Sequence, residues 1–212
     1  MANSLPDFSF ETTAFGLGKS CVVGVDEVGR GPLAGPVIAA AVRLDPACIP
    51  QGLNDSKRLS HAKRQRIADI LWQTAEVAVG QASVEEIDHL NILHASMLAM
   101  ERAVAGLVTP ADHVLVDGNR IPPALRGRAE ALVKGDSRCL SISAASIVAK
   151  IWRDRLMVDL AQQHPGYGWD RNAGYPTKEH QVALRNLGVT PHHRRSFRPV
   201  HNILYQEKSV SD

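Results

Sequence analysis

Residues 22–36 place the strongest constraint on how this chain can fold. The stretch begins Val-Val-Gly-Val, an apolar and mostly β-branched run without helical spacing, which predicts a buried strand. Two adjacent carboxylates, Asp26 and Glu27, follow directly, and a turn rich in glycine and proline comes after them. Gly29 and Gly31 lack a Cβ, so the backbone there can approach a ligand closely. The pattern fits either a metal site near a phosphodiester or a polar strand end followed by a sharp hairpin.

The composition is that of one globular domain. The chain has 212 residues, of which 44% are hydrophobic and 22% charged, and this is enough for one substantial core. The formal net charge of +2 does not by itself indicate nucleic-acid binding. Basic side chains nevertheless cluster locally, as at residues 57–58 and 194–195, and such patches can bind phosphates. The two histidines at 192–193 are expected to lie on the same basic surface.

No sequence feature divides the chain into several domains. We expect a flexible N-terminal arm over residues 1–20, one folded domain over 21–203 and a polar C-terminal tail over 204–212. The arm lacks the pattern of a secretory signal, and no apolar run is long enough for a membrane span. The three cysteines form no Cys-x-x-Cys pair, so neither a disulfide framework nor a zinc site is predicted. These features predict a cytoplasmic protein with no membrane partner.

Hydrophobic periodicity predicts strands mixed with helices. Strands are predicted over residues 21–26, 37–43, 77–82, 114–117 and 131–134, and helices over 61–74, 91–107, 143–163 and 178–187. The methionines in the apolar stripe of the second helix are interpreted as core filler. Trp152, in the third helix, is expected to pack against the sheet. Elements in this order predict a layered α/β domain.

Three of the predicted strands lead to carboxylates. Asp26 and Glu27 follow the first strand, Asp117 ends the fourth, and Asp136 follows the fifth after one glycine. Neighbouring strands would bring these acids together, and they would repel one another unless a cation lay between them. Oxygen ligands favour Mg²⁺ or Mn²⁺, and two such ions about 4 Å apart would hold the attacking and leaving oxygens of a phosphodiester. The alternative is a set of merely solvated strand ends.

Asp154 is a separate candidate. On an ideal helix it lies on the same side as Ile147 and Ile151, where an unpaired acid is costly. It stands four residues after Lys150, so a structural ion pair is the favoured interpretation. A role at or beside a metal is the alternative.

Several short motifs together resemble the signature of bacterial ribonuclease HII. They occur in order at residues 26–36 (DEVGRGPLAGP), 54–57 (NDSK), 116–119 (VDGN), 134–136 (KGD), 144–150 (AASIVAK), 174–180 (GYPTKEH) and 192–197 (HHRRSF). The resemblance covers residues 21–203, and the combination is highly specific. It implies a ribonuclease H-like α/β fold, with a central mixed β-sheet flanked by α-helices, as a catalytic domain.

The resemblance also assigns roles to residues. It implies that a quartet of acids holds the metal and catalyses the reaction, namely Asp26, Glu27, Asp117 and Asp136. It implies that the substrate is bound by the Gly-Arg-Gly element (Gly29, Arg30 and Gly31) and by a tyrosine that senses the RNA-to-DNA junction, Tyr175. We assign Lys57 to substrate binding as well.

The implied reaction is hydrolysis of RNA in RNA–DNA hybrids and incision 5′ of single ribonucleotides embedded in duplex DNA. Mn²⁺ or Mg²⁺ is the implied cofactor, and the products carry a 3′-hydroxyl and a 5′-phosphate. The expected partners are the hybrid and the ribonucleotide-containing duplex, and the expected state is a monomer. Two other classes stay open: a hybrid-binding protein that does not cleave, and a transposase- or resolvase-type nuclease that cuts plain DNA.

Two positions depart from the family pattern. Ala173 stands where many relatives have a basic residue, which puts one backbone contact in doubt, although Arg171 could replace it. Ser143 stands where alanine is usual, and it is expected to pack near small residues with little effect.

Overall fold

The computed structural model describes residues 5–205 of the chain. A five-stranded sheet lies at its centre, with the spatial order β3-β2-β1-β4-β5. The strands are β1 (Val22–Val28), β2 (Val37–Arg43), β3 (Glu76–Ala82), β4 (His113–Asp117) and β5 (Ala129–Leu132). β1 pairs antiparallel with β2 and parallel with β4. The predicted α/β fold with a mixed central sheet is therefore confirmed.

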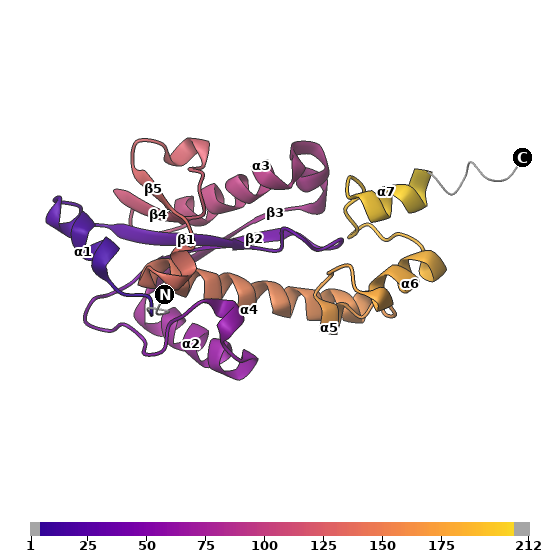
Figure 1. Ribbon diagram of the computed structural model, residues 1–212, viewed down its shortest axis with the longest axis horizontal. Helices are drawn as coiled ribbons and strands as arrows, with labels where there is room; N and C mark the ends of the chain where they lie inside the picture. The colour runs from indigo at the N-terminus through magenta and orange to yellow at the C-terminus, as the bar shows by residue number, and fades with distance from the viewer. Residues whose placement is uncertain (1–4, 206–212) are drawn as a thin grey trace, which may run out of the picture.

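Helices cover both faces of this sheet, as Figure 1 shows. α3 (Val84–Ala105) packs against β1, β2 and β3 on one face. On the other face, α4 (Leu140–Gln163) packs against β1 and β2, and α2 (His61–Thr74) packs against α4. The other helices are α1 (Ser9–Gly16), α5 (Trp169–Asn172), α6 (Lys178–Leu187) and α7 (Arg198–Tyr205), and the 3₁₀ turns are η1 (Ser56–Arg58), η2 (Pro123–Leu125) and η3 (Gly135–Ser137). α5, α6 and α7 gather at the end of the molecule opposite α1 (Figure 1).

Two glycines let the covering helices lie close to the sheet. A Cβ added to Gly24 in β1 would lie 2.2 Å from the backbone carbonyl carbon of Ser141 in α4. A Cβ added to Gly80 in β3 would lie 2.3 Å from the carbonyl oxygen of Ala99 in α3. Any side chain at these positions would force the helix away from the strand. The spacing of both layers therefore depends on these glycines.

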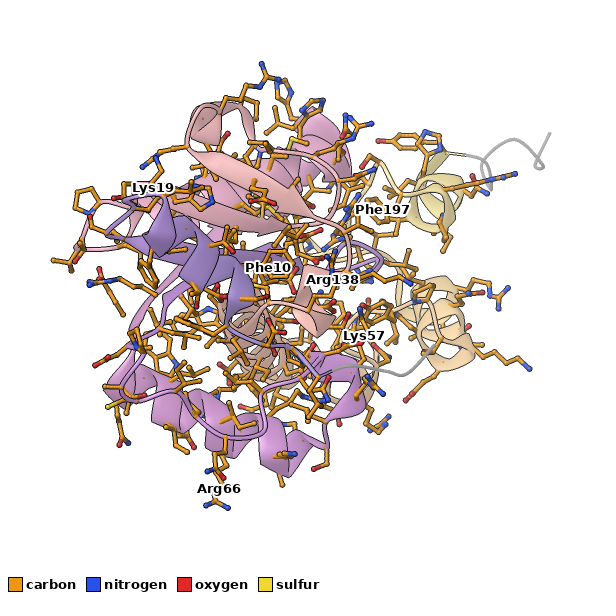
Figure 2. All side chains as sticks on the ribbon, turned by 60° about the vertical axis from the view of Figure 1, so that its left-hand side comes forward. Phe10, Lys19, Lys57, Arg66, Arg138 and Phe197 are labelled. Carbon is orange, nitrogen blue, oxygen red and sulfur yellow. The ribbon has the colours of Figure 1, made fainter. Side chains whose placement is uncertain are left out.

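The prediction of a flexible arm over residues 1–20 was wrong for residues 5–20, the part that the structure describes. Asp7 exchanges backbone hydrogen bonds with the loop before α4: its amide donates to Arg138 and its carbonyl oxygen accepts from Leu140, each at 3.1 Å. Glu11 of α1 is only 1% exposed. The Arg138 guanidinium lies 5.1 Å from the centre of the Phe10 ring, and Figure 2 shows the two side chains together. The arm is thus packed onto the domain through α1.

The ends of the chain limit what can be compared with the predictions. Residues 1–4 of the predicted arm and 206–212 of the predicted tail lie outside the described residues. Residues 204 and 205 belong to α7 rather than to a tail. Within residues 5–205, no helix combines the length and the apolar character that crossing a bilayer requires.

Three predictions about the helices need correction. α3 begins at Val84, well before the helix predicted over 91–107, and it is kinked at Asn91, where φ is 66°. Met100 is buried as predicted, but Met97 is only partly buried, and both line a cavity beside Glu27 and Asp117. Trp152 does not pack against the sheet. It is 44% exposed, and its ring centre lies 6.0 Å from that of Trp72 on α2.

Candidate active site

The pairing of β1 with β4 brings the first three acids together. Val25 lies opposite Val116 in this parallel pair, so Asp26 and Asp117 follow at the same end of two adjacent strands. Side chains alternate between the faces of a strand. Val23 and Val25 belong to the core on the α3 side, so Glu27 faces α3 and Asp26 faces α4. The predicted convergence of these strand ends is confirmed.

η3 brings Asp136 to the same place. Lys134 has a left-handed backbone, with φ of 56°, and turns the chain after β5. Asp117 Oδ1 then accepts hydrogen bonds from the backbone amides of Gly135 at 2.7 Å and of Asp136 at 3.4 Å. The predicted strand over 131–134 is displaced, because β5 runs from Ala129 to Leu132. Asp136 therefore reaches the site from a 3₁₀ turn and not from a strand end.

The protonation of these acids is strongly perturbed. Burial, together with the negative charges of Glu27 and Asp117, raises the pKa of Asp26 well above its usual value, and a hydrogen bond from Ser146 offsets part of this. Burial also raises the pKa of Glu27, against the opposing effect of Arg30, whose Nη1 lies 3.1 Å from Glu27 Oε1. Burial of a carboxylate among like charges disfavours its ionised form. A nearby cation would reverse this effect.

Burial acts on the other two acids in the same direction. It raises the pKa of Asp117, and backbone hydrogen bonds and the charge of Lys57 oppose the shift. It raises the pKa of Asp136, and the charge of Asp117 adds to that shift while Lys57 opposes it. Lys57 therefore favours the ionised form of both acids.

The donor set fits a divalent cation. Glu27 Oε2 is buried and has no hydrogen-bond partner among residues 5–205, a costly state that a cation would relieve. The available donors are carboxylate oxygens, which favour Mg²⁺ or Mn²⁺. Among the described residues, no three His, Cys, Asp or Glu side chains form a ready-made metal cage. Glu27 instead pairs with Arg30, and Asp117 binds backbone amides, so these side chains would have to rotate to enclose an ion.

The four acids share one cavity with the predicted substrate-binding residues. This cavity has a volume of about 410 Å³ and is lined by Asp26, Glu27, Asp117, Asp136, Gly29, Arg30, Gly31, Lys57 and Tyr175, with Val28, Ser56, Ser146 and Lys150. A Cβ on Gly31 would lie 3.4 Å from Cε1 of the Tyr175 ring. Lys57 is exposed at its rim and is labelled in Figure 2.

Asp154 lies in a neighbouring groove rather than in this cavity. Its Oδ1 lies 2.7 Å from Lys150 Nζ, so the ion pair predicted from the spacing is present. Arg171 lines the same groove and pairs with Asp170 and Glu179. The geometry does not bring Asp154 together with the acid quartet.

The prediction that residues 192–195 lie on a basic surface was wrong for His193 and Arg194, which are buried. His193 is 1% exposed and Arg194 is 0% exposed. Burial, with His180 nearby, lowers the pKa of His193 to about 3. Arg194 donates to the backbone carbonyl oxygens of Gly29 and Arg30, in the turn at residues 29–31 that we call the glycine turn. Its side chain therefore does not face solvent.

Sequence reasoning also missed three residues around the site. The hydroxyl oxygens of Ser56 and Ser146 lie 3.0 Å apart, and Ser146 hydrogen-bonds Asp26. Both serines lie inside motifs that were noted, so the signal was available. Arg153 of α4 is fully buried beneath the glycine turn, and no local pattern indicates this. Ser143 is buried, and its hydroxyl has no hydrogen-bond partner within residues 5–205.

Comparisons with known proteins agree with the geometry. A family profile described as Ribonuclease HII matches residues 23–200. The chain is 68% identical to a ribonuclease HII of Ruegeria pomeroyi, over 95% of this chain and 86% of that protein. The ribonuclease H2 of Pyrococcus horikoshii is similar in fold, with a TM-score of 0.74 and 25% identity over 90% of this chain and 100% of that one. Bst-RNase HIII in complex with Mn²⁺ is similar in fold, with a TM-score of 0.67 and 22% identity over 92% of this chain and 72% of that one. The chain therefore belongs to the ribonuclease HII family and is a ribonuclease H, an endonuclease of the hydrolase class.

Proposed function

We propose that this chain cleaves RNA in RNA–DNA hybrids and also cuts on the 5′ side of a single ribonucleotide embedded in duplex DNA. The products carry a 3′-hydroxyl and a 5′-phosphate. The observation that supports this best is the single cavity shared by four carboxylates, the glycine turn and Tyr175. Clustered acids without cations would repel a nucleic-acid backbone. Cleavage with bound cations therefore explains the cavity better than duplex binding alone.

The proposed mechanism uses two metal ions, Mn²⁺ or Mg²⁺, held by Asp26, Glu27, Asp117 and Asp136. Bound there, the ions would activate the attacking water and stabilise charge on both reacting oxygens. Two of the acids lie in β1, one ends β4 and one lies in η3, so these elements hold the four carboxylates around one cavity. The crystal structure of Bst-RNase HIII, which is similar in fold, is a complex with Mn²⁺, and this supports a divalent metal as the cofactor.

Recognition of the ribonucleotide is proposed for the glycine turn and Tyr175. A lone ribonucleotide differs from its neighbours only by its 2′-hydroxyl, so the site must contact that group. Backbone groups at Gly29, Arg30 and Gly31 can approach a sugar because both glycines lack a Cβ. Tyr175 is 42% exposed and offers a hydroxyl for the 2′-oxygen and a flat ring for the next sugar. That next sugar must be deoxy for the ring to lie close.

Phosphate binding is proposed for Lys57, which is exposed at the rim of the cavity. An ammonium there would contact the backbone of any duplex without reading its sequence. The proposed partner is thus a duplex that contains at least one ribonucleotide. The monomeric state and the cytoplasmic location stay predictions.

The test uses three labelled duplexes: one without ribonucleotides, one with a single ribonucleotide and one with a full RNA strand. With Mg²⁺ or Mn²⁺ present, the wild-type protein should cut the second and third and leave the first intact, and Asp117→Asn should cut none. Binding without cutting would identify a hybrid-binding protein. Cutting of the plain DNA duplex would identify a nuclease of the transposase or resolvase type.

A further inference from the structure

Two buried arginines lie beneath the glycine turn. Arg153 of α4 and Arg194, which precedes α7, are both 0% exposed. Arg194 donates from Nη2 to the carbonyl oxygen of Gly29 at 2.6 Å, and from Nη1 to that of Arg30 at 3.0 Å. Its Nε donates to the carbonyl oxygen of Gly35 at 2.9 Å. One guanidinium therefore holds the glycine turn and also the chain at Gly35, four residues after the turn.

Arg153 extends this support to the loop that carries Tyr175. Its Nε donates to Pro36 at 3.1 Å, its Nη2 to Ala34 at 3.0 Å and its Nη1 to Ala173 at 2.9 Å, in each case to a carbonyl oxygen. Ala173 stands two residues before Tyr175. The same guanidinium thus links the segment after the glycine turn to the tyrosine loop.

The two arginines have no acidic partner. Within residues 5–205, neither forms an ion pair, and every contact named above is to a carbonyl oxygen. Arg194 also lies 5.0 Å from the ring centre of Phe197, which Figure 2 labels. Buried charges are costly, and apolar side chains often replace them without loss of stability. The arrangement therefore indicates a need for several donors at fixed positions.

The direction of these contacts determines the direction of two amides. No peptide bond in residues 5–205 is cis, and in a trans peptide the C=O and the following N–H point in opposite directions. The carbonyl groups of Gly29 and Arg30 both point at Arg194. The amides of Arg30 and Gly31 therefore point away from it, and neither has an acceptor among the described residues. Successive amides that point the same way form a concavity that binds anions and polar oxygens.

We propose that Arg194 is a positioning residue of the cleavage reaction, which fixes the amides of Arg30 and Gly31 toward the nucleotide. This inference rests on the proposed function of the cavity. Arg194 acts through the turn, because its side chain has no exposed surface from which to contact a phosphate. Loss of Arg194 should therefore impair turnover of bound substrate more than binding of duplexes in general.

The experiment compares Arg194→Gln and Arg194→Lys with Arg195→Gln, which removes the exposed neighbouring charge. Each variant is assayed for kcat/KM on the single-ribonucleotide duplex, at a temperature at which thermal melts show that it is folded. The Kd for an all-DNA duplex is measured at several salt concentrations. Backbone amide resonances of Arg30 and Gly31 are recorded in the protein without substrate.

The expected result for Arg194→Gln is a loss of kcat/KM of about a hundredfold, the size that a misplacement of about 1 Å can cause. The Kd for plain duplex and its salt slope should stay unchanged, and the amide resonances of Arg30 and Gly31 should shift. Arg194→Lys should recover only part of the loss, because one ammonium cannot reach three carbonyl oxygens in a fixed plane. If the Gln variant does not fold, a loss of about tenfold in the Lys variant is the expected result, intermediate between wild type and a misplacement of about 1 Å.

Three results would overturn the proposal. Unchanged kcat/KM in folded Arg194→Gln would mean that the residue only stabilises the fold. Full recovery by Arg194→Lys would mean that charge, and not geometry, matters. A weaker Kd for plain duplex with a flatter salt slope, the effect of losing an exposed phosphate-binding charge, would make Arg194 a phosphate contact. Failure of the wild-type protein to cut any ribonucleotide-containing duplex would instead refute the proposed function, and the amide shifts would still report on the position of the turn.

Discussion

A group of acids and a pair of arginines both adjoin the glycine turn at residues 29–31. The fold provides hydrogen-bond partners for the two groups to different extents. The acid group is Asp26, Glu27, Asp117 and Asp136, and the arginine pair is Arg153 and Arg194. Every side-chain nitrogen of the arginine pair donates to a carbonyl oxygen. In the acid group, by contrast, Glu27 Oε2 is buried and finds no hydrogen-bond partner in the part of the chain that the structure describes. The arginine pair therefore has all its hydrogen-bond partners within residues 5–205, whereas the acid group does not.

Protonation leads to the same contrast. Burial lowers the pKa of Arg153 to about 10 and that of Arg194 to about 9, so both stay charged at neutral pH. Burial and neighbouring carboxylates raise the pKa of Asp26 well above its usual value. Charged residues with a structural role find their partners within the protein, whereas those of a binding site find them in the ligand. The comparison therefore assigns support to the arginine pair and cation binding to the acid group.

The largest effect is expected from neutralising the acid group. Asp26→Asn and Asp117→Asn should each reduce cleavage by at least about a hundredfold, as the loss of an essential charge-stabilising group does, and both should fold. In metal-free buffer the Tm of Asp26→Asn should rise, because like-charge repulsion and the burial of a charge are relieved. Cleavage assays and thermal melts measure the two effects. Near-wild-type Mg²⁺-dependent activity in both variants would contradict the assignment.

The stability gain of Asp26→Asn should depend on pH. The folded-state pKa of Asp26 is raised, so the folded protein binds a proton more readily than the unfolded chain, and its stability falls as pH rises through that pKa. The advantage of the variant in metal-free buffer should be largest above the raised pKa and should vanish at about pH 4, the ordinary aspartate value. Thermal melts of both proteins across this range provide the measurement. An advantage that grows as pH falls would have the wrong sign.

Tyr175 should have a smaller effect than the acid group, on substrate choice. Tyr175→Ala should lose about tenfold in kcat/KM on the single-ribonucleotide duplex, in line with the loss of one stacking contact. Tyr175→Phe keeps the ring and should lose only about threefold, the size of one hydrogen bond. A full RNA–DNA hybrid serves as the comparison substrate. Equal rates for wild type and Tyr175→Ala on the single-ribonucleotide duplex would remove Tyr175 from the recognition site.

Lys57 should distinguish an exposed cation from the buried arginine pair. Lys57→Gln should weaken binding of every duplex by a similar factor and reduce the salt slope by about 1. Arg194→Gln should leave that slope unchanged. Affinity measurements at several salt concentrations test both. An unchanged slope in Lys57→Gln would show that this side chain is ordinary solvated charge.

Asp154 should have the smallest effect. It is paired with Lys150 in an i,i+4 arrangement, and both side chains are partly exposed, so Asp154→Asn should lower the free energy of unfolding by about 0.3–0.5 kcal/mol. Turnover should stay near the wild-type value, because Asp154 lines a groove outside the cavity of the acid group. Urea unfolding and steady-state kinetics measure the two quantities. A large loss of turnover at an unchanged Tm would place Asp154 with the metal-binding acids.

The sheet and the acid group could be predicted because both depend on local sequence. Runs of β-branched residues define β1 and β4, and the carboxylates directly follow those runs. The burial of Arg194 could not be predicted in this way, because its partner Gly29 is 165 residues away. Outside regular elements no periodicity tells which way a side chain points. A pair of arginines in a loop was therefore interpreted as surface charge.

The same limit explains the other errors. Glu11 packs against the start of α4 through a hydrogen bond from the Ser141 amide, 130 residues away, so the first residues looked unattached in the sequence. The first half of α4 is buried around its whole circumference, with residues 141–149 all buried. It therefore has no apolar stripe that could indicate where Trp152 points.

Calorimetric titration with Mn²⁺ tests the central claim, that the acid group is completed by a divalent cation, most directly. The wild-type protein should bind the ion and release protons, because an acid whose pKa is raised must ionise to bind it. Asp45→Asn, which alters an exposed acid just beyond the end of β2, should behave like the wild type. Asp26→Asn and Asp117→Asn should lose most of the affinity. Equal Mn²⁺ binding by all four proteins would contradict the account.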